Sequence, residues 1–116
     1  MINLQEIINT LDLTVLTQPQ DFSGVLPLGG YASDLLSCVM AGACHQGLWV
    51  TLQAHGNIVA VAALLDLAAI IISEGAQPDE TTIARANAEG IALLSTAQPS
   101  FAIIGRLWEL GLRTGS

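Results

Sequence analysis

The longest apolar run of the chain covers residues 58–72 and is interrupted only by Asp66. It is roughly three residues too short for a membrane-spanning helix. Residues 58–65 are apolar on every side of a helix, and residues 68–72 end in three consecutive isoleucines. A helix buried on more than one side, followed by a strand covered on both faces, accounts for the two halves. The run therefore predicts a helix packed on a parallel sheet.

The rest of the chain alternates between helical and strand patterns. Apolar periodicity predicts helices over residues 3–11, from Ser33 to about 41, 57–66, 79–88 and from 99 or 100 to 112. Strands are predicted at residues 12–16, 24–28, 48–53, 68–72 and 91–94, with a sharp turn at Gly29 and Gly30. This alternation indicates an α/β fold with three layers, in which a small, mainly parallel sheet carries helices on both faces.

Charge and targeting signals exclude several classes of function. Ten acidic residues face three arginines and no lysine, so the net charge of −7 repels nucleic acid and anionic membranes. Two cysteines do not form a disulfide framework, and the N-terminus lacks the basic region of a signal peptide. We predict a cytoplasmic protein with one domain over residues 1–116, of which 113–116 form a frayed tail, and with no cofactor.

Polar residues follow the predicted strands, where parallel sheets bind small molecules. The candidate ligand-binding residues are Gly29, Gly30, Ser33, Gln53, His55, Asn57, Ser73, Glu74, Ser95 and Thr96. If the strands are parallel, these loops gather along one edge of the sheet. The alternative is that the same residues only cap helices and form turns.

Catalytic and metal sites have little support in the sequence. His55 has no Ser or Cys nucleophile at a recognisable spacing, and no P-loop or lysine is present to contact phosphates. The spacing of Cys38, Cys44, His45 and His55 is not that of a zinc site. We therefore predict no metal and no catalytic residues, with an enzyme that uses His55 as the remote alternative.

An excess of apolar residues points to association with another chain. Hydrophobic residues make up 52% of the sequence and charged residues only 11%, so a second copy is expected to cover part of the surface. In the last helix, Phe101, Ile104, Trp108 and Leu112 share one face, and Gly105 allows a close approach. The candidate interface residues are Trp49, Phe101, Gly105 and Trp108, with burial in the chain's own core as the alternative for each.

Two longer segments carry a resemblance to a known family. These are G-G-Y-A-S-D-L-L-S at residues 29–37 and W-V-T-L-Q-A-H-G-N-I-V-A-V-A at 49–62, followed by A-I-I-I at 69–72 and L-L-S-T at 93–96. Together they resemble the DRTGG domain family, and in particular its small stand-alone members, which are similar to the N-terminal domain of HPr kinase/phosphorylase. The literal DRTGG pentapeptide is absent. The resemblance implies a fold like the N-terminal domains of HPr kinase and the Mur ligases, self-association, and a regulatory or ligand-sensing role.

Three functions of different classes follow. The first is a non-catalytic, homodimeric regulatory module that binds a small nucleotide-like or phosphorylated metabolite. The second is a structural subunit that docks on a larger enzyme through the last helix or the all-apolar helix. The third is an enzyme that uses His55.

Overall fold

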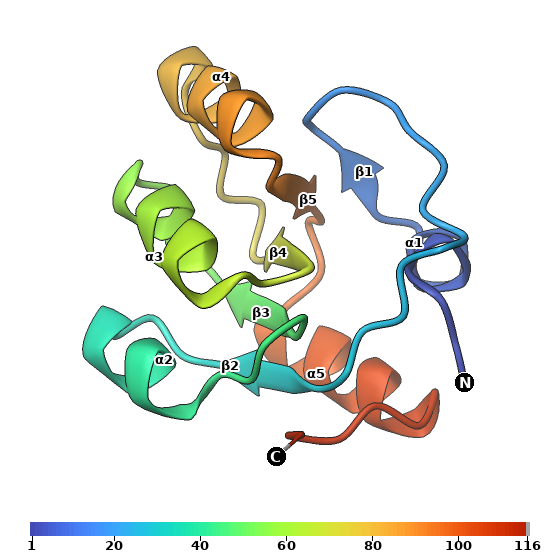
Figure 1. Ribbon diagram of the computed structural model, residues 1–116. Helices are drawn as coiled ribbons and strands as arrows, with labels where there is room; N and C mark the ends of the chain where they lie inside the picture. The colour runs from blue at the N-terminus through green and yellow to red at the C-terminus, as the bar shows by residue number, and fades with distance from the viewer. Residues whose placement is uncertain (116) are drawn as a thin grey trace.

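The computed structural model describes residues 1–115 as a five-stranded sheet with helices on both faces (Figure 1). The strands are β1 (Thr14–Val15), β2 (Gly30–Ala32), β3 (Leu48–Thr51), β4 (Ala69–Ile72) and β5 (Ala92–Ser95). The helices are α1 (Leu4–Leu11), α2 (Leu36–Gly42), α3 (Asn57–Leu65), α4 (Glu80–Glu89) and α5 (Ser100–Glu109).

The strand order across the sheet is β1-β5-β4-β3-β2. Strands β2 to β5 run parallel, and β1 pairs antiparallel with β5 at one edge. Strand β2 forms the other edge, opposite the first three residues of β3. The predicted α/β class with a mainly parallel sheet is confirmed.

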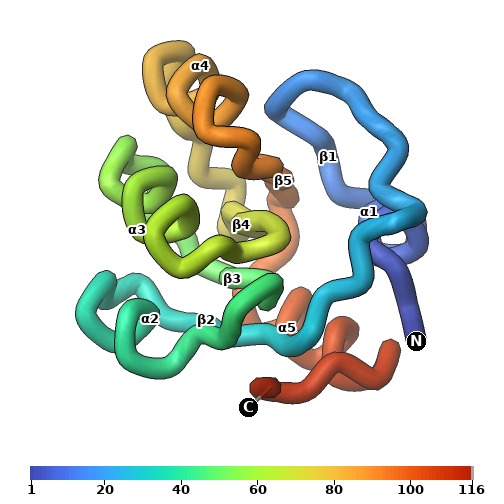
Figure 2. The backbone as a smooth tube through the Cα atoms, in the orientation of Figure 1, coloured from blue at the N-terminus to red at the C-terminus, as the bar shows by residue number. Residues whose placement is uncertain are grey.

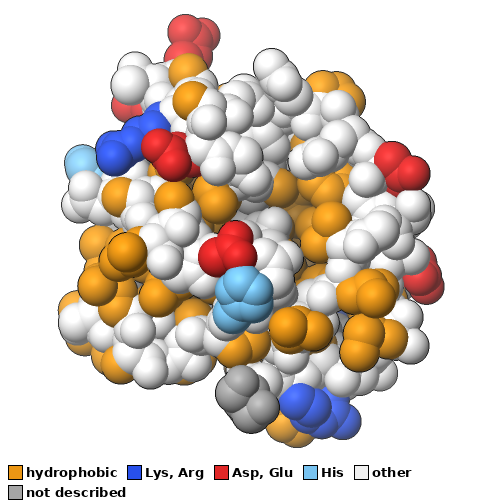
Figure 3. All heavy atoms as spheres, viewed as in Figure 1, with side chains coloured by type: hydrophobic (Ala, Val, Ile, Leu, Met, Phe, Trp, Pro, Cys, Tyr) orange, Lys and Arg blue, Asp and Glu red, His pale blue; other side chains and the backbone are white. Residues whose placement is uncertain are grey.

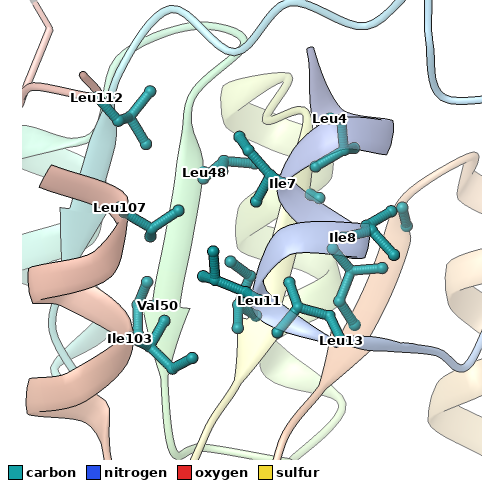
Figure 4. Packing of buried hydrophobic residues seen from close by; sticks show 14 of the residues in the cluster. Leu4, Ile7, Ile8, Leu11, Leu13, Leu48, Val50, Ile103, Leu107 and Leu112 are labelled. Atoms are coloured by element: carbon teal, nitrogen blue, oxygen red, sulfur yellow. The ribbon is translucent and has the colours of Figure 1, made fainter. Parts of the chain in front are cut away.

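Two apolar layers enclose the sheet. Helices α2, α3 and α4 cover one face, and α1 and α5 cover the other (Figures 1 and 2). Alternate residues of β3 point to the two layers, as expected for a strand that is buried on both sides. Leu48 and Val50 meet Ile7 of α1 and Leu107 of α5 (Figure 4), whereas Trp49 packs among residues of the α2–α4 layer.

The ends of α4 and α3 can be compared with the predicted helix boundaries. Asp79 caps α4 by accepting a hydrogen bond from the Thr82 N–H at 2.8 Å, and Gly90 ends the helix in the left-handed conformation. The helix predicted from residue 57 begins there, with Gly56 as the N-cap of α3 and Asn57 as its first residue. Leu64 of α3 is 70% exposed, so this apolar helix is not buried on every side.

The strand predicted at residues 24–28 and the turn at Gly29 and Gly30 are also wrong. The strand of this region is β2, and it begins at Gly30. The Ser33 hydroxyl accepts from the Leu35 N–H at 3.1 Å in a local turn, so α2 starts at Leu36 and not directly after Ser33. The position of β2 is therefore determined by its pairing with β3, and its three residues alone do not predict a strand.

Helix α5 packs on the sheet through a face other than that of Phe101 and Trp108. Ile103 and Leu107 are buried, whereas Phe101 is 90% exposed, Trp108 is 53% exposed and Ile104 is also exposed. Leu112, beyond the helix, is buried. The face formed by Phe101, Ile104 and Trp108 thus lies on the surface, and burial in the core, the alternative considered for Phe101 and Trp108, is wrong.

Candidate functional site

The carboxyl ends of β3, β4 and β5 lie at one edge of the sheet, as predicted. The Thr96 N–H donates to the Ile72 carbonyl at 3.0 Å, and the Ser73 N–H donates to the Thr51 carbonyl at 2.9 Å. Residues Ser73, Glu74, Ser95 and Thr96 therefore lie on neighbouring strand ends. The loops after β4 and β5 converge as predicted, whereas Gly29 and Gly30 lie at the other end of the sheet.

Most polar groups at this edge bind one another. Asp34, just before α2, accepts from the Thr51 hydroxyl at 2.7 Å and from the Leu52 N–H at 2.9 Å. The Gln53 side-chain amide donates to the Asp34 carbonyl at 3.2 Å. These contacts hold the start of α2 against the end of β3, which is a structural role for Gln53.

A second group of contacts fixes the start of α5. The buried Ser73 hydroxyl shares a hydrogen bond with the Ser100 hydroxyl at 2.5 Å. The Glu74 carboxylate accepts from the Ser100 N–H at 2.7 Å, and the Thr96 hydroxyl accepts from the Gln98 N–H at 3.1 Å. Ser95 is buried opposite Thr14 of β1. The contacts of this edge match those expected of caps and turns.

His55 and Asn57 are exposed, and the one hydrogen bond between them joins residues two positions apart in the chain. The Asn57 N–H donates to the His55 Nδ1 at 3.4 Å, and no carboxylate among residues 1–115 forms an ion pair with His55. The pKa of Asp79 is lowered, chiefly by the hydrogen bond from the Thr82 N–H and only slightly by His55. Among the described residues, His55 therefore has no carboxylate at ion-pair distance.

Gly29 and Gly30 lie at the other end of the sheet from His55. Gly30 is opposite Leu48, the first residue of β3, so it cannot join a pocket at the carboxyl edge. A side chain at Gly29 would collide with the Cys44 sulfur and with the backbone of Gly115. These glycines allow the tail to pack closely on the start of β2.

A mainly apolar pocket of about 280 Å³ lies between β2, α5 and the tail. Its walls include Ile104, Trp108 and Val50, with Arg113 at one side. The Arg113 guanidinium carbon lies 4.1 Å from the centre of the Trp108 ring, and its Nη1 donates to the Trp108 carbonyl at 2.9 Å. The aromatic wall and the cation are therefore held together. Sequence reasoning missed this pocket because its parts are distant in the chain.

Trp49 is not on the surface. Its side chain is fully buried, and its indole N–H donates to the Ser33 carbonyl at 2.8 Å. Its assignment as a candidate interface residue is corrected to a core residue. Phe101, Gly105 and Trp108 are exposed, as an interface requires.

Three further observations bear on the type of site. The described residues contain no group of three or more potential metal ligands, and the exposed pair His45 and Asp66, 3.2 Å apart, stands alone. No helix formed by residues 1–115 has both the length and the apolar character needed to cross a bilayer. Over α2 the visible surface carries hydrophobic and uncharged side chains (Figure 3).

Comparisons with models of protein families and with curated proteins find no match. Among solved structures, the chain is similar to the CBS and DRTGG domains of the regulatory region of Clostridium perfringens pyrophosphatase, complexed with its activator diadenosine tetraphosphate. The TM-score is 0.73 at 18% sequence identity, and the similarity covers 96% of this chain and 47% of that one. The chain thus spans about half the length of that regulatory region. The predicted resemblance to DRTGG domains is confirmed at the level of the fold.

Proposed function

We propose that this chain is a non-catalytic regulatory module that forms a homodimer and senses a small nucleotide-like ligand in the cytoplasm. In this proposal residues 1–116 form one DRTGG-like domain. Support for a regulatory role comes from the fold shared with a pyrophosphatase regulatory region that binds a nucleotide activator. The carboxyl edge of the sheet adds support, since its polar groups are mostly engaged in holding helices.

The observation that carries the dimer is the exposed face of α5. Phe101, Ile104 and Trp108 lie on it at helical spacing around Gly105. A side chain at Gly105 would meet no atom of residues 1–115 within 4 Å, so packing within this part of the chain does not require glycine there. Glycine inside a helix costs about 1 kcal/mol relative to alanine. A second helix that crosses closely at Gly105 gives this glycine a function.

Sedimentation of the full chain tests the dimer. The unmodified protein should sediment as a dimer in the micromolar range. Phe101→Asp should sediment as a folded monomer, because it places a charge in the contact. Leu64→Asp makes the same kind of change at an exposed apolar position of α3 and should leave the dimer intact. A monomeric unmodified protein, or equal effects of the two variants, would contradict the proposed interface.

A second candidate function is docking on a larger enzyme. It is favoured by the similar structure, in which this fold covers only 47% of a longer regulatory chain. In this case the α5 face would contact a different polypeptide. A stoichiometric partner that copurifies with the tagged chain and is lost in Phe101→Asp, together with a monomer in isolation, would favour docking over the homodimer.

A further inference from the structure

The outer edge of β2 presents unpaired backbone groups beside the pocket. The Leu48 N–H donates to the Gly29 carbonyl, and the Ser33 N–H donates to the Val50 carbonyl. In a parallel strand, the backbone N–H and C=O groups of every second residue point toward the neighbouring strand. Those of Tyr31 face β3, so the backbone N–H and C=O groups of Gly30 and Ala32 point away from it. The Gly30 N–H is taken by the Arg113 carbonyl at 2.7 Å.

The remaining groups of this edge form an acceptor–donor pair. Within residues 1–115, neither the Gly30 carbonyl nor the Ala32 N–H has a hydrogen-bonding partner. Both residues line the pocket. They are adjacent along the edge, so a planar molecule could bind the carbonyl through a donor and the N–H through a neighbouring acceptor. The 6-amino group and N1 of adenine are such a pair.

The other walls of the pocket suit the same ligand. Ile104, Leu107 and Val50 provide apolar surface, and Trp108 provides an aromatic wall whose orientation is fixed by Arg113. The volume of about 280 Å³ is near the lower end of ligand sites, which run from about 300 to 1,000 Å³. A base with its ribose is of this size class.

The negative charge of the protein limits how many phosphate groups the ligand can carry. Arg113 is the one arginine that lines the pocket, and the chain carries a net charge of −7. A polyphosphate would be repelled by this charge. We propose that the pocket binds the adenine base of a nucleoside or nucleoside monophosphate through the edge of β2. The proposal rests on the ligand-sensing function above and gives it a site and a ligand class.

Amide spectra of the full chain test the contact directly. Adenosine should shift the resonances of the Ala32 amide and of the Trp108 indole N–H. Purine riboside, which lacks the 6-amino group, should bind about tenfold more weakly, because the Gly30 carbonyl loses its donor. Adenosine that leaves the Ala32 amide unchanged, or that binds no more tightly than purine riboside, would overturn the proposal.

Variants separate the edge contact from the fold. Ala32→Pro replaces the outward N–H with the proline ring, a change that edge strands tolerate, and should weaken adenosine binding at least about tenfold. Ala32→Gly keeps the N–H and should bind normally. Equal affinities in two folded variants would count against the edge contact. If Ala32→Pro fails to fold, the spectra of the unmodified chain decide.

Failure of this site can be distinguished from failure of the dimer. One chain provides all the lining residues. Ile104 and Trp108 belong both to the pocket and to the α5 face, whereas Phe101 belongs to the face alone. The monomeric Phe101→Asp variant should therefore still bind adenosine. A dimer without adenosine binding would overturn the ligand and leave the dimer standing. A monomer whose Ala32 amide resonance shifts with adenosine would overturn the dimer and support the ligand site.

Discussion

The Asp34 carboxylate accepts a hydrogen bond from the Thr51 hydroxyl at 2.7 Å, which ties the segment before α2 to the last residue of β3. The same carboxylate oxygen accepts from the Leu52 N–H at 2.9 Å. Asp34 thus closes the end of a strand by binding groups that solvent or a ligand would otherwise contact. Its role at the carboxyl edge is to hold the fold together.

Replacing Asp34 should therefore destabilise the protein. Asp34→Ala removes both hydrogen bonds to a charged acceptor and should lower the free energy of unfolding by about 1–3 kcal/mol. Asp34→Asn keeps an oxygen acceptor and should lose less. Urea unfolding followed by circular dichroism measures both values, and equal losses in the two variants would contradict this explanation.

The sequence predicted the buried strands and capped helices well. The isoleucines of β4 and the apolar run of α3 leave few alternatives, and Asp79 and Gly90 mark α4 at both ends. The edge strand β2 was missed because it has three residues and begins with glycine, so its pattern is too short to detect. It exists because β3 provides a neighbour, and this pairing is not local in the sequence.

The functional surface was only partly predictable for a related reason. Helix α5 is apolar on two faces, and the sequence does not say which of them meets the sheet. The structure buries Ile103 and Leu107 and exposes Phe101 and Trp108. The pocket beside β2 depends on this choice and on the path of the tail, so residue spacing could not reveal it.

The two tryptophans should respond in opposite ways to substitution. Trp49 is fully buried and donates to the Ser33 carbonyl, so Trp49→Phe should cost about 1–3 kcal/mol of stability. The protein should remain dimeric, and the remaining emission, from Trp108, should shift to longer wavelength when Phe101→Asp is added and separates the two chains. Trp108→Phe should leave blue-shifted emission from Trp49. Loss of the dimer in folded Trp49→Phe would contradict its assignment to the core.

Asp12 is a place where a glycine should stabilise the chain. It ends α1 in the left-handed conformation with φ 55° and ψ 50°, where a side chain is unfavourable. Asp12→Gly should raise the free energy of unfolding by about 0.5–1 kcal/mol. Ala84→Gly, inside exposed α4, should lower it by about 1 kcal/mol. Thermal unfolding of the two variants should show shifts of opposite sign.

Acid should weaken the start of α4 through Asp79. The hydrogen bond from the Thr82 N–H holds the pKa of this carboxyl below its ordinary value of 3.8. A lowered pKa in the folded state means that the stabilisation is complete above the unfolded value and is lost as pH falls through the folded value. Asp79→Asn keeps an acceptor without this titration, so its deficit in stability relative to the unmodified protein should shrink below pH 3.8.

Urea midpoints measured from neutral to acidic pH check the Asp79 prediction. Glu89→Gln makes the same charge change at the other end of α4, where a negative charge is unfavourable to the helix dipole. It should not destabilise the protein at neutral pH. A constant difference between Asp79→Asn and the unmodified chain at all pH values would contradict the linkage.

Gly105 should separate the stability of one chain from the stability of the dimer. Gly105→Ala adds a methyl group that meets no atom within 4 Å, so each chain should gain up to about 1 kcal/mol of helix stability. The same methyl group should keep two α5 helices apart and weaken the dimer. Gly24→Ala, also in open space but outside the helices, should leave association unchanged.

Dilution series in sedimentation measure the strength of the dimer. Urea unfolding of Gly105→Ala in the monomeric Phe101→Asp background measures the stability of one chain independently. A Gly105→Ala protein that dimerises as tightly as the unmodified chain would contradict the close crossing of two α5 helices, because the added methyl group would have to fit between them.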